Sequence, residues 1–383
     1  MKTPIYLDYN ATTPVHSEVL EAMLPYFSNK FANAASKSHT FGLSADKVVE
    51  NARKQIATSI NAVAQEIVFT SGSTEAINLA IKGVAEKYKS KGNHIITVKT
   101  EHKAVLDTCK YLEENNYRVI YLNVDENGLI NLDDLKKELN DETILVCVML
   151  ANNETGVIQP MKEIAEIVHK NNSILMSDAT QAIGKTNVDV QELGIDLMCL
   201  SAHKFYGPKG SGALYIRRKN PRVSLSPQIH GGGHENSLRS GTLNIPAIVG
   251  LGKAIELSAV ITEWQQSKTK KLRDYLESTL LKEVEEIKII GASTERLPNT
   301  SNIQFPIKSN TLIKKMMDVA VSTGSACTSA KPEPSHVLLS MGLSKEEADK
   351  CIRFSLGIKT TKEELDYTIE KIKKIITENS VLS

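Results

Sequence analysis

The sequence predicts an α/β protein with a mainly parallel central sheet, helices on both faces of that sheet, and a smaller α+β unit. Between residues 66 and 218, short runs rich in β-forming residues alternate with stretches of helical periodicity. These runs are apolar on both faces, which is typical of parallel strands buried between two layers of helices. At 383 residues the chain is too long for one small core, so a second unit is expected.

Seven strands are expected in the first unit. They cover residues 66–70, 94–98, 118–124, 143–150, 174–179, 196–202 and 212–218. Several of them are separated by helical patterns over residues 75–88, 102–115 and 161–172. The last two runs stand so close together in the sequence that they can pair directly, without a helical crossover.

A long helical pattern over residues 250–286 connects the two units, with no Pro or Gly after Gly252. In the second unit, strands and then a closing helix are expected over residues 299–305, 319–323, 351–356 and from 362 onward. The expected domains are therefore a large cofactor-binding domain of residues 16–255 and a small domain of residues 1–15 and 256–383.

Charge and hydropathy exclude several classes of function. Lys and Arg number 46 against 45 Asp and Glu, which gives a formal net charge of +1. This balance provides no long-range attraction to nucleic acid or to an anionic membrane, so neither is expected as a partner. The N-terminal MKTPIYLDYN lacks the apolar run of a signal peptide, and no stretch of about 18 apolar residues is expected to span a bilayer. The sequence therefore predicts a soluble, cytoplasmic protein.

The five cysteines divide into two kinds. Their number is odd and no pair has C-x-x-C spacing, so all five are expected to be thiols. Cys109, Cys147, Cys199 and Cys351 have apolar or helix-patterned neighbours and are expected to be small buried hydrophobes. Cys327 lies in AVSTGSACTSAKPEPSH, whose composition predicts an exposed, mobile loop. It is either a nucleophile on a swinging loop or an incidental surface thiol.

Three places in the first unit carry residues that could do chemistry. Ser73 and Thr74, at a helix start, offer hydroxyls and backbone N–H groups to a phosphate, although alone they fit a capping box better. Asp178 ends a strand, where an acidic residue can also cap a helix or bind Mg²⁺. Lys204 follows an apolar run; most strand-end lysines are solvated, but a desolvated one is a nucleophile toward aldehydes.

Together these three places match the needs of pyridoxal 5'-phosphate: an anchored phosphate, a carboxylate on the ring nitrogen, and a lysine on the aldehyde. The motifs of competing chemistries, G-x-G-x-x-G, the P-loop, G-x-S-x-G and H-E-x-x-H, are absent from the sequence. HGGGHE at residues 230–235 has no third ligand nearby and is interpreted as a turn, so no metal is expected.

At this point the chain resembles the cysteine desulfurases of the bacterial housekeeping and nitrogen-fixation type. These enzymes belong to the class V aminotransferase-like branch of the fold-type-I pyridoxal-phosphate enzymes. The resemblance extends from YLDYNATTP at residues 6–14 to RFSLG at residues 353–357. Its most specific motifs are TEHKAVL, NNETG, DATQ, SAHKFYGPKG, GGGHE followed by RSGT, and SGSACTS.

The resemblance implies a role for each matching residue. Lys204 would carry the cofactor, His102 would stack over its ring, and Asp178 would pair with the ring nitrogen. The other residues implied in cofactor binding are Gln181 at the ring hydroxyl, Ser73, Thr74, Ser201 and His203 at the phosphate, Asn153 beside the ring, and Thr242 from a second subunit. Those implied in substrate binding are Asn33, Asn153 and Arg353. Lys204, His102 and the nucleophile Cys327 would be catalytic.

The implied activity converts L-cysteine to L-alanine and leaves the sulfur on Cys327 as a persulfide. A homodimer that passes this sulfur to acceptors, such as an iron–sulfur scaffold protein, is implied as well. The sequence departs from the family pattern at Ala32, Ala34 and Ser237, and it ends at Ser383, where relatives carry a longer docking tail. The acceptor is therefore left open. Two alternatives also remain: an ordinary aminotransferase or lyase of the same fold, and a non-catalytic sulfur-carrier subunit.

Overall fold

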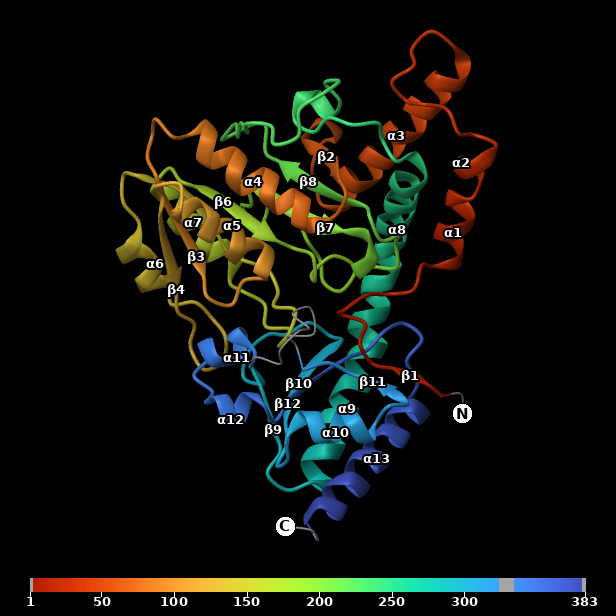
Figure 1. Ribbon diagram of the computed structural model, residues 1–383, viewed down its shortest axis with the longest axis vertical. Helices are drawn as coiled ribbons and strands as arrows, with labels where there is room; N and C mark the ends of the chain where they lie inside the picture. The colour runs from red at the N-terminus through yellow and green to blue at the C-terminus, as the bar shows by residue number, and fades with distance from the viewer. Residues whose placement is uncertain (1–2, 324–333, 381–383) are drawn as a thin grey trace.

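The computed structural model describes residues 3–323 and 334–380, which form two lobes (Figure 1). The large lobe is built on a seven-stranded sheet and the small lobe on a three-stranded sheet. In the large lobe the strands stand in the order β2-β8-β7-β6-β5-β3-β4. Their bounds are β2 Ile67–Thr70, β3 His94–Val98, β4 Arg118–Leu122, β5 Thr143–Cys147, β6 Ile174–Asp178, β7 Leu197–Ser201 and β8 Gly212–Ile216.

The direction of the strands confirms the predicted fold class. β4, β3, β5, β6 and β7 all run in the same direction, whereas β8 pairs antiparallel with both β7 and β2. The β7–β8 pair puts Ser201 opposite Gly212 without a helical crossover, as the short spacing predicted. Because the five parallel strands end at the same edge of the sheet, their last residues are brought together there.

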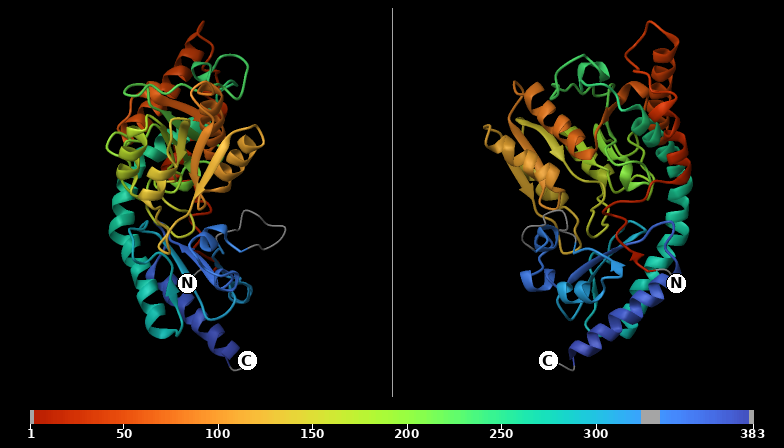
Figure 2. Two further views of the ribbon diagram at one scale, coloured as in Figure 1. Left: turned by 90° about the vertical axis from the view of Figure 1, so that its left-hand side faces the viewer. Right: turned by 45° about the vertical axis from the view of Figure 1, so that its right-hand side comes forward.

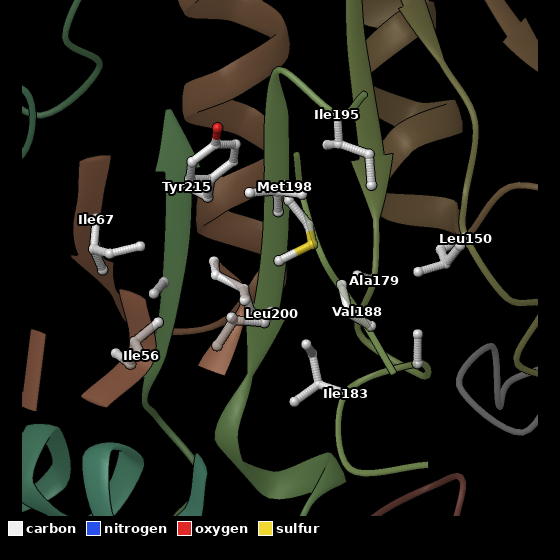
Figure 3. Close-up of a cluster of buried hydrophobic side chains, with 14 of the residues drawn as sticks. Ile56, Ile67, Leu150, Ala179, Ile183, Val188, Ile195, Met198, Leu200 and Tyr215 are labelled. Carbon is white, nitrogen blue, oxygen red and sulfur yellow. The ribbon is translucent and has the colours of Figure 1, made fainter. Parts of the chain in front are cut away.

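Two layers of helices cover the sheet, as predicted. The covering helices are α3 Thr40–Ser59, α7 Met161–Lys170 and α8 Ile245–Trp264 on one face, and α4 Ser73–Lys87 and α5 Lys103–Glu113 on the other. Figure 3 shows the first of these interfaces, in which Ile67, Tyr215 and Met198 lie side by side on neighbouring strands. The strands are apolar on both faces because both faces are buried.

The small lobe contains a short antiparallel sheet and receives both ends of the described chain (Figure 1). Its sheet has the order β12-β10-β9, and a separate parallel pair is formed by β1 and β11. The bounds are β1 Ile5–Tyr6, β9 Lys288–Ile289, β10 Thr300–Gln304, β11 Val319–Ala320 and β12 Cys351–Ser355. Against them pack α9 (Lys270–Glu283) and α13 (Lys362–Ser380), through side chains such as Leu280 and Ile369.

A continuous helix, Ile245–Glu283, connects the lobes and combines α8, a π-helical turn over Gln265–Thr269, and α9 (Figure 2). The predicted connecting helix is therefore present, and it begins five residues before Gly250. The expectation that no segment is apolar enough to span a bilayer was wrong, since a window in this helix has a mean hydropathy of 1.6. Within the structure 61% of that window is buried, so its apolar composition is that of a helix packed in the core.

The elements that were not predicted are mostly short. Besides α3, β1 and β9, they are α1 Ser17–Met23, α2 Pro25–Ser28, α6 Leu132–Glu138, α10 Ser309–Lys315, α11 His336–Ser340 and α12 Lys345–Ala348. A two-residue strand has no periodicity in the sequence, because its pairing is decided by the partner strand. The division of the chain into domains at residues 15 and 255 stays a prediction.

Candidate active site

A cavity of about 510 Å³ lies between the two lobes, at the edge of the large sheet where the parallel strands end. It brings together ten of the residues that were assigned from the sequence. They are Ser73, Thr74, His102, Asn153, Asp178, Gln181, Ser201, His203, Lys204 and Arg353. Asp178 and Ser201 are the last residues of β6 and β7, and Ser73 is the first residue of α4. Most of the site residues belong to separate sequence motifs, and they lie together because the parallel strands end at the same edge of the sheet.

One corner of this cavity can receive an anion. The N-terminus of the 15-residue helix α4 opens onto it, and Gly72, with a φ of 155°, forms the turn before the helix. A Cβ at Gly212 would lie 2.7 Å from the Gly72 Cα, so this turn can rest against β8 only where β8 has no side chain. The hydroxyl of Ser73 lies 2.6 Å from that of Thr180, and Ser201 borders the same corner.

The charges around this corner also favour an anion. Burial, together with the nearby Lys204, Lys209 and Lys185, lowers the pKa of His203 to about 4. The neutral His203 ring is hydrogen-bonded through Nδ1 to the Thr12 hydroxyl at 3.1 Å. The ammonium groups of Lys204 and Lys209 beside this imidazole create a positive potential, and a bound phosphate would offset it.

Asp178 is buried, and one of its carboxylate oxygens is fixed by the protein. Oδ1 accepts hydrogen bonds from the backbone N–H of Thr180 at 2.9 Å and from the thiol of Cys199 at 3.3 Å. Asp178 and Cys199 are register partners on β6 and β7. Because both donors engage the same oxygen, the carboxylate has a set orientation, and its side chain borders the cavity.

Lys204 lies in a 3₁₀ turn, Ala202–Lys204, directly after β7. Its Nζ donates to the backbone carbonyl of Asn10 at 2.7 Å and to that of Ala11 at 2.8 Å. Gln181 Nε2 donates to the same Asn10 carbonyl at 3.0 Å. The amine and the amide therefore share one acceptor in the N-terminal segment.

His102 is the N-cap residue of α5, and its Nδ1 accepts the backbone N–H of Ala104 at 3.1 Å. A neutral His102 ring consequently carries its proton on Nε2. Burial lowers the pKa of His102 from its ordinary value, an effect that Asp178 opposes and that Lys204 and His336 reinforce. At neutral pH the ring is therefore uncharged, with its Nδ1 lone pair engaged by Ala104 and its Nε2–H able to donate.

Arg353, on β12, brings a guanidinium to the opposite wall of the cavity. Its Nη2 pairs with Asp8 Oδ1 at 2.6 Å, and its Nη1 donates to the backbone carbonyl of Asn153 at 3.0 Å. The buried Nε has no hydrogen-bond partner among the described residues. A guanidinium with an unused buried donor at the cavity wall is suited to an additional anionic oxygen.

Several residues of the site were not assigned from the sequence. Asn10 and Ala11 belong to YLDYNATTP, a motif that supported the resemblance without suggesting a role for them. Glu154 is fully buried, its pKa is raised by that burial, and its carboxylate is hydrogen-bonded by Ser335. The ring of His336 borders the cavity and bonds to the Glu101 carbonyl at 2.9 Å. The only sequence signal for His336 was its position next to the Cys327 segment.

Three assigned residues are not among those that line the cavity. Asn33 is exposed, and its Oδ1 accepts the N–H of Ala35 at 2.9 Å. Thr242 is also exposed, as a residue would be if it reached another subunit. Cys327 lies outside the described residues. The roles of all three stay predictions. Among the described residues, no group of three or more His, Cys, Asp and Glu could hold a metal ion.

Comparison with a family model matches residues 5–368 to the aminotransferase class-V family. Among curated relatives, the "Cysteine desulfurase IscS" of Anaeromyxobacter sp. (strain K) is 50% identical over 380 residues, 98% of this chain and 94% of the relative. The "Cysteine desulfurase IscS" of Neisseria meningitidis serogroup C is 51% identical over 378 residues, which cover 98% and 93%.

Solved structures of similar proteins have the same fold. A "NifS-like protein" is 39% identical, with a TM-score of 0.90, over 97% of this chain and 99% of the other. The NifS-like protein from Rickettsia africae has 33% identity and a TM-score of 0.87, with 97% and 99% covered. A structure described as "SspA in complex with cysteine" has 36% identity and a TM-score of 0.83, with 93% and 100% covered.

Proposed function

This chain belongs to the class-V aminotransferase family of pyridoxal-phosphate enzymes, and we propose that it acts as a cysteine desulfurase, which takes the sulfur of L-cysteine and leaves L-alanine. One observation carries the proposal. Lys204, Asp178 and the anion-binding corner at α4, which lie far apart in the sequence, border a single cavity of about 510 Å³. Arg353 stands on the opposite wall, where an amino acid needs a partner for its carboxylate.

The residues present fit the cofactor. The helix start at Ser73 and the positive corner around His203 would hold the phosphate, and the oriented carboxylate of Asp178 would pair with a protonated ring nitrogen. Lys204 is the amine that would attach to the aldehyde, with His102 over the ring. When bound, pyridoxal phosphate supplies an aldehyde that links covalently to amines and a ring that withdraws electrons from the substrate Cα.

The protein's own groups then have distinct tasks. Arg353 binds the substrate carboxylate and thereby orients the amino acid in the cavity. Lys204, once its amine is free, removes the Cα proton. His102 can take the proton of the substrate thiol once its Nδ1 lone pair is released from the Ala104 N–H. A cysteine thiolate of the enzyme attacks the substrate sulfur. A sulfur–sulfur bond forms, the substrate Cβ–S bond breaks, and its electron pair remains with the carbon skeleton, which is protonated to alanine.

The sulfur-accepting cysteine is Cys327. The four cysteines that the structure describes are all buried. Burial raises the pKa of Cys109 and of Cys351 to about 12, and it raises those of Cys147 and Cys199 well above the ordinary thiol value. None of these four can present a thiolate at neutral pH, and the thiolate is the reactive form.

The chain on both sides of the Cys327 segment is attached close to the cavity. Ser322 forms a β-bridge with Arg353, whose side chain borders the cavity. On the other side, Ser335 bonds to Glu154 and the next residue, His336, borders the cavity as well. These attachments support a sulfur transfer from the substrate to Cys327.

A second copy of the chain is the proposed partner of an exposed apolar surface near the N-terminus. Between residues 20 and 43, six large apolar side chains are 48–73% exposed: Leu20, Leu24, Phe27, Phe31, Phe41 and Leu43. Exposed aromatic and aliphatic side chains of this kind are enriched in protein interfaces. In a homodimer Thr242 would reach the cofactor phosphate of the partner. The persulfide would then pass, in the cytoplasm, to an acceptor such as an iron–sulfur scaffold protein.

The test combines two variants of the purified protein. Cys327→Ser should retain the yellow absorbance of the bound cofactor but release no sulfide from L-cysteine, whereas Lys204→Ala should lose the normal absorbance. Borohydride reduction followed by peptide mapping should place the cofactor on Lys204. Keto-acid formation in place of alanine and sulfide would indicate an ordinary aminotransferase. A colourless protein, even with excess cofactor, would indicate a non-catalytic carrier and contradict the proposal.

A further inference from the structure

The amine of Lys204 is hydrogen-bonded to two backbone carbonyls of the N-terminal segment. The distances from Nζ are 2.7 Å to the Asn10 oxygen and 2.8 Å to the Ala11 oxygen. A carbonyl oxygen can only accept a hydrogen bond, so the lysine donates in both contacts. An ammonium group has three N–H donors and is therefore well matched to such a pair of acceptors.

The Asn10 carbonyl is held in place by the side chain of its own residue, which is 1% exposed. Asn10 Nδ2 donates to the Asn153 carbonyl at 3.1 Å and to the Thr300 hydroxyl at 2.9 Å. Its Oδ1 accepts from Asn299 Nδ2 at 3.1 Å. The backbone N–H of Asn10 donates to the hydroxyl of Ser355 at 2.9 Å. These anchors belong to both lobes, because Asn153 follows β5 whereas the other three lie in the small lobe.

The same carbonyl also connects Lys204 to the residue assigned to the ring hydroxyl. Gln181 Nε2 occupies its second lone pair at 3.0 Å, and Gln181 Oε1 accepts from Lys185 Nζ at 2.6 Å. Lys185 is 2% exposed, and burial lowers its pKa well below the ordinary value. With both lone pairs in use, the Asn10 oxygen has a fixed position relative to the ring-binding amide.

We propose that Asn10 is a positioning residue, whose anchored carbonyl, together with that of Ala11, forms the docking site of the Lys204 ammonium when this amine is not attached to the cofactor. This inference rests on the proposed function, since it assumes that substrate amines displace Lys204. The docking site stabilises the released lysine, and it therefore favours exchange of the lysine for the amine of an incoming amino acid. Loss of the anchors should weaken every ligand that must displace Lys204.

The experiment is an equilibrium titration of the holoenzyme, followed by cofactor absorbance. L-Alanine is the ligand, because it carries the required amine and no sulfur to be removed. In Asn10→Ala the dissociation constant for L-alanine should rise about tenfold, the effect of losing one hydrogen bond to a charged group. The absorbance of the ligand-free variant should remain that of the wild type, because Lys204 is then attached to the cofactor.

Two controls separate docking from a general structural effect. Asn171→Ala removes two side-chain hydrogen bonds, against three for Asn10→Ala, to the Asn140 carbonyl at 2.9 Å and the Ser173 hydroxyl at 3.0 Å, and it lies at the end of α7 outside the cavity. This variant should bind L-alanine as the wild type does. 3-Mercaptopropionate has a carboxylate and a thiol but no amine to displace Lys204, so Asn10→Ala should bind it with unchanged affinity.

A matched pair at Thr300 tests the same anchor if Asn10→Ala does not fold. Thr300→Val removes the hydroxyl that accepts from Asn10 and should raise the L-alanine dissociation constant about threefold, the effect of one neutral hydrogen bond. Thr300→Ser retains the hydroxyl and should stay within twofold of the wild type.

The outcomes are distinguishable. A wild-type protein that shows no absorbance change with L-cysteine or L-alanine would overturn the proposed function and the docking role together. A responsive wild type, with Asn10→Ala or Thr300→Val binding L-alanine equally well, would overturn only the docking role. An equal loss of affinity for L-alanine and 3-mercaptopropionate would also overturn it, since the cavity as a whole would then be disturbed.

Discussion

The two walls of the active-site cavity are built in different ways. The wall assigned to the cofactor consists of residues at the ends of neighbouring elements of one sheet, such as Asp178 at the end of β6 and Ser201 at the end of β7. The wall assigned to the substrate is assembled from opposite ends of the chain. Its Asp8–Arg353 ion pair joins residues that are 345 positions apart.

The two walls therefore also differ in the interactions that hold them in place. The cofactor wall continues into strands that are buried on both faces, so its geometry is fixed by close packing. The substrate wall depends on polar contacts between lobes, for example Ser335 with Glu154 and Arg353 with the Asn153 carbonyl. Changes in the cofactor wall should therefore abolish the chemistry, whereas changes in the substrate wall should weaken substrate binding and leave the cofactor in place.

The largest effect is expected at the centre of the cofactor wall. Lys204→Ala should lower the turnover of L-cysteine by at least about a thousandfold, because it removes both the attachment amine and the base for the Cα proton. The midpoint of urea unfolding should shift little, since the hydrogen bonds from the amine to the Asn10 and Ala11 carbonyls lie in the cavity and not in the packed core. Residual turnover within tenfold of the wild type would contradict the role of Lys204.

Acidification should weaken the large lobe before it affects the small lobe. His94 on β3 is fully buried, and burial together with Arg118 lowers its pKa from 6.5 to about 4. Between pH 6.5 and about 4, the His94 imidazole is therefore protonated in the unfolded chain but neutral in the folded chain. This contribution to stability is complete above pH 6.5 and is lost as the pH falls toward 4, by about 3 kcal/mol at most.

Urea unfolding of the wild type and of His94→Gln at pH 7, 6 and 5 measures this loss. The free energy of unfolding of the wild type should fall more steeply with decreasing pH than that of the variant, which has no imidazole at this position to protonate. Parallel curves for the two proteins would exclude His94 as a source of the pH dependence.

In the substrate wall, Arg353→Lys should raise the KM for L-cysteine about tenfold to a hundredfold. A lysine keeps the charge but cannot pair with a carboxylate through two parallel N–H groups while it also holds Asp8 and the Asn153 carbonyl. The cofactor absorbance and its affinity should not change. A variant that loses cofactor instead of substrate affinity would show that the two walls do not function separately.

The smallest effect is expected at Ser335, which caps α11 and bonds to Glu154. Ser335→Ala should lower the free energy of unfolding by about 1 kcal/mol, the usual cost of losing an N-cap. It should also reduce sulfide release more than cofactor binding, because Ser335 attaches the chain next to the Cys327 segment. Ser344→Ala is the matched control, since Ser344 caps α12 in the same lobe and its hydroxyl is hydrogen-bonded to Glu347, away from the cavity.

Much of the fold was predictable because its signals are local. The runs 94–98 and 212–218 predicted β3 and β8 within two residues, since strands buried on both faces are continuously apolar. The short strands β1 and β9 were not predicted, because two paired residues have no measurable period, whereas β11 was predicted from the run 319–323. The 20-residue helix α3 was not predicted, although its apolar spacing is present in the sequence.

The sequence by itself was enough to predict the strands of the large sheet, the residues assigned to the cofactor wall, and the family. Each of these predictions depends on a short motif of a few adjacent residues. Lys204, Asp178 and His102 could all be assigned from such motifs. Only the tertiary structure decided that the Asn10 carbonyl accepts a hydrogen bond from Lys204 and that Asp8 pairs with Arg353. These are contacts between segments brought together by packing of the two lobes, and no local pattern of residues encodes a contact across 345 positions.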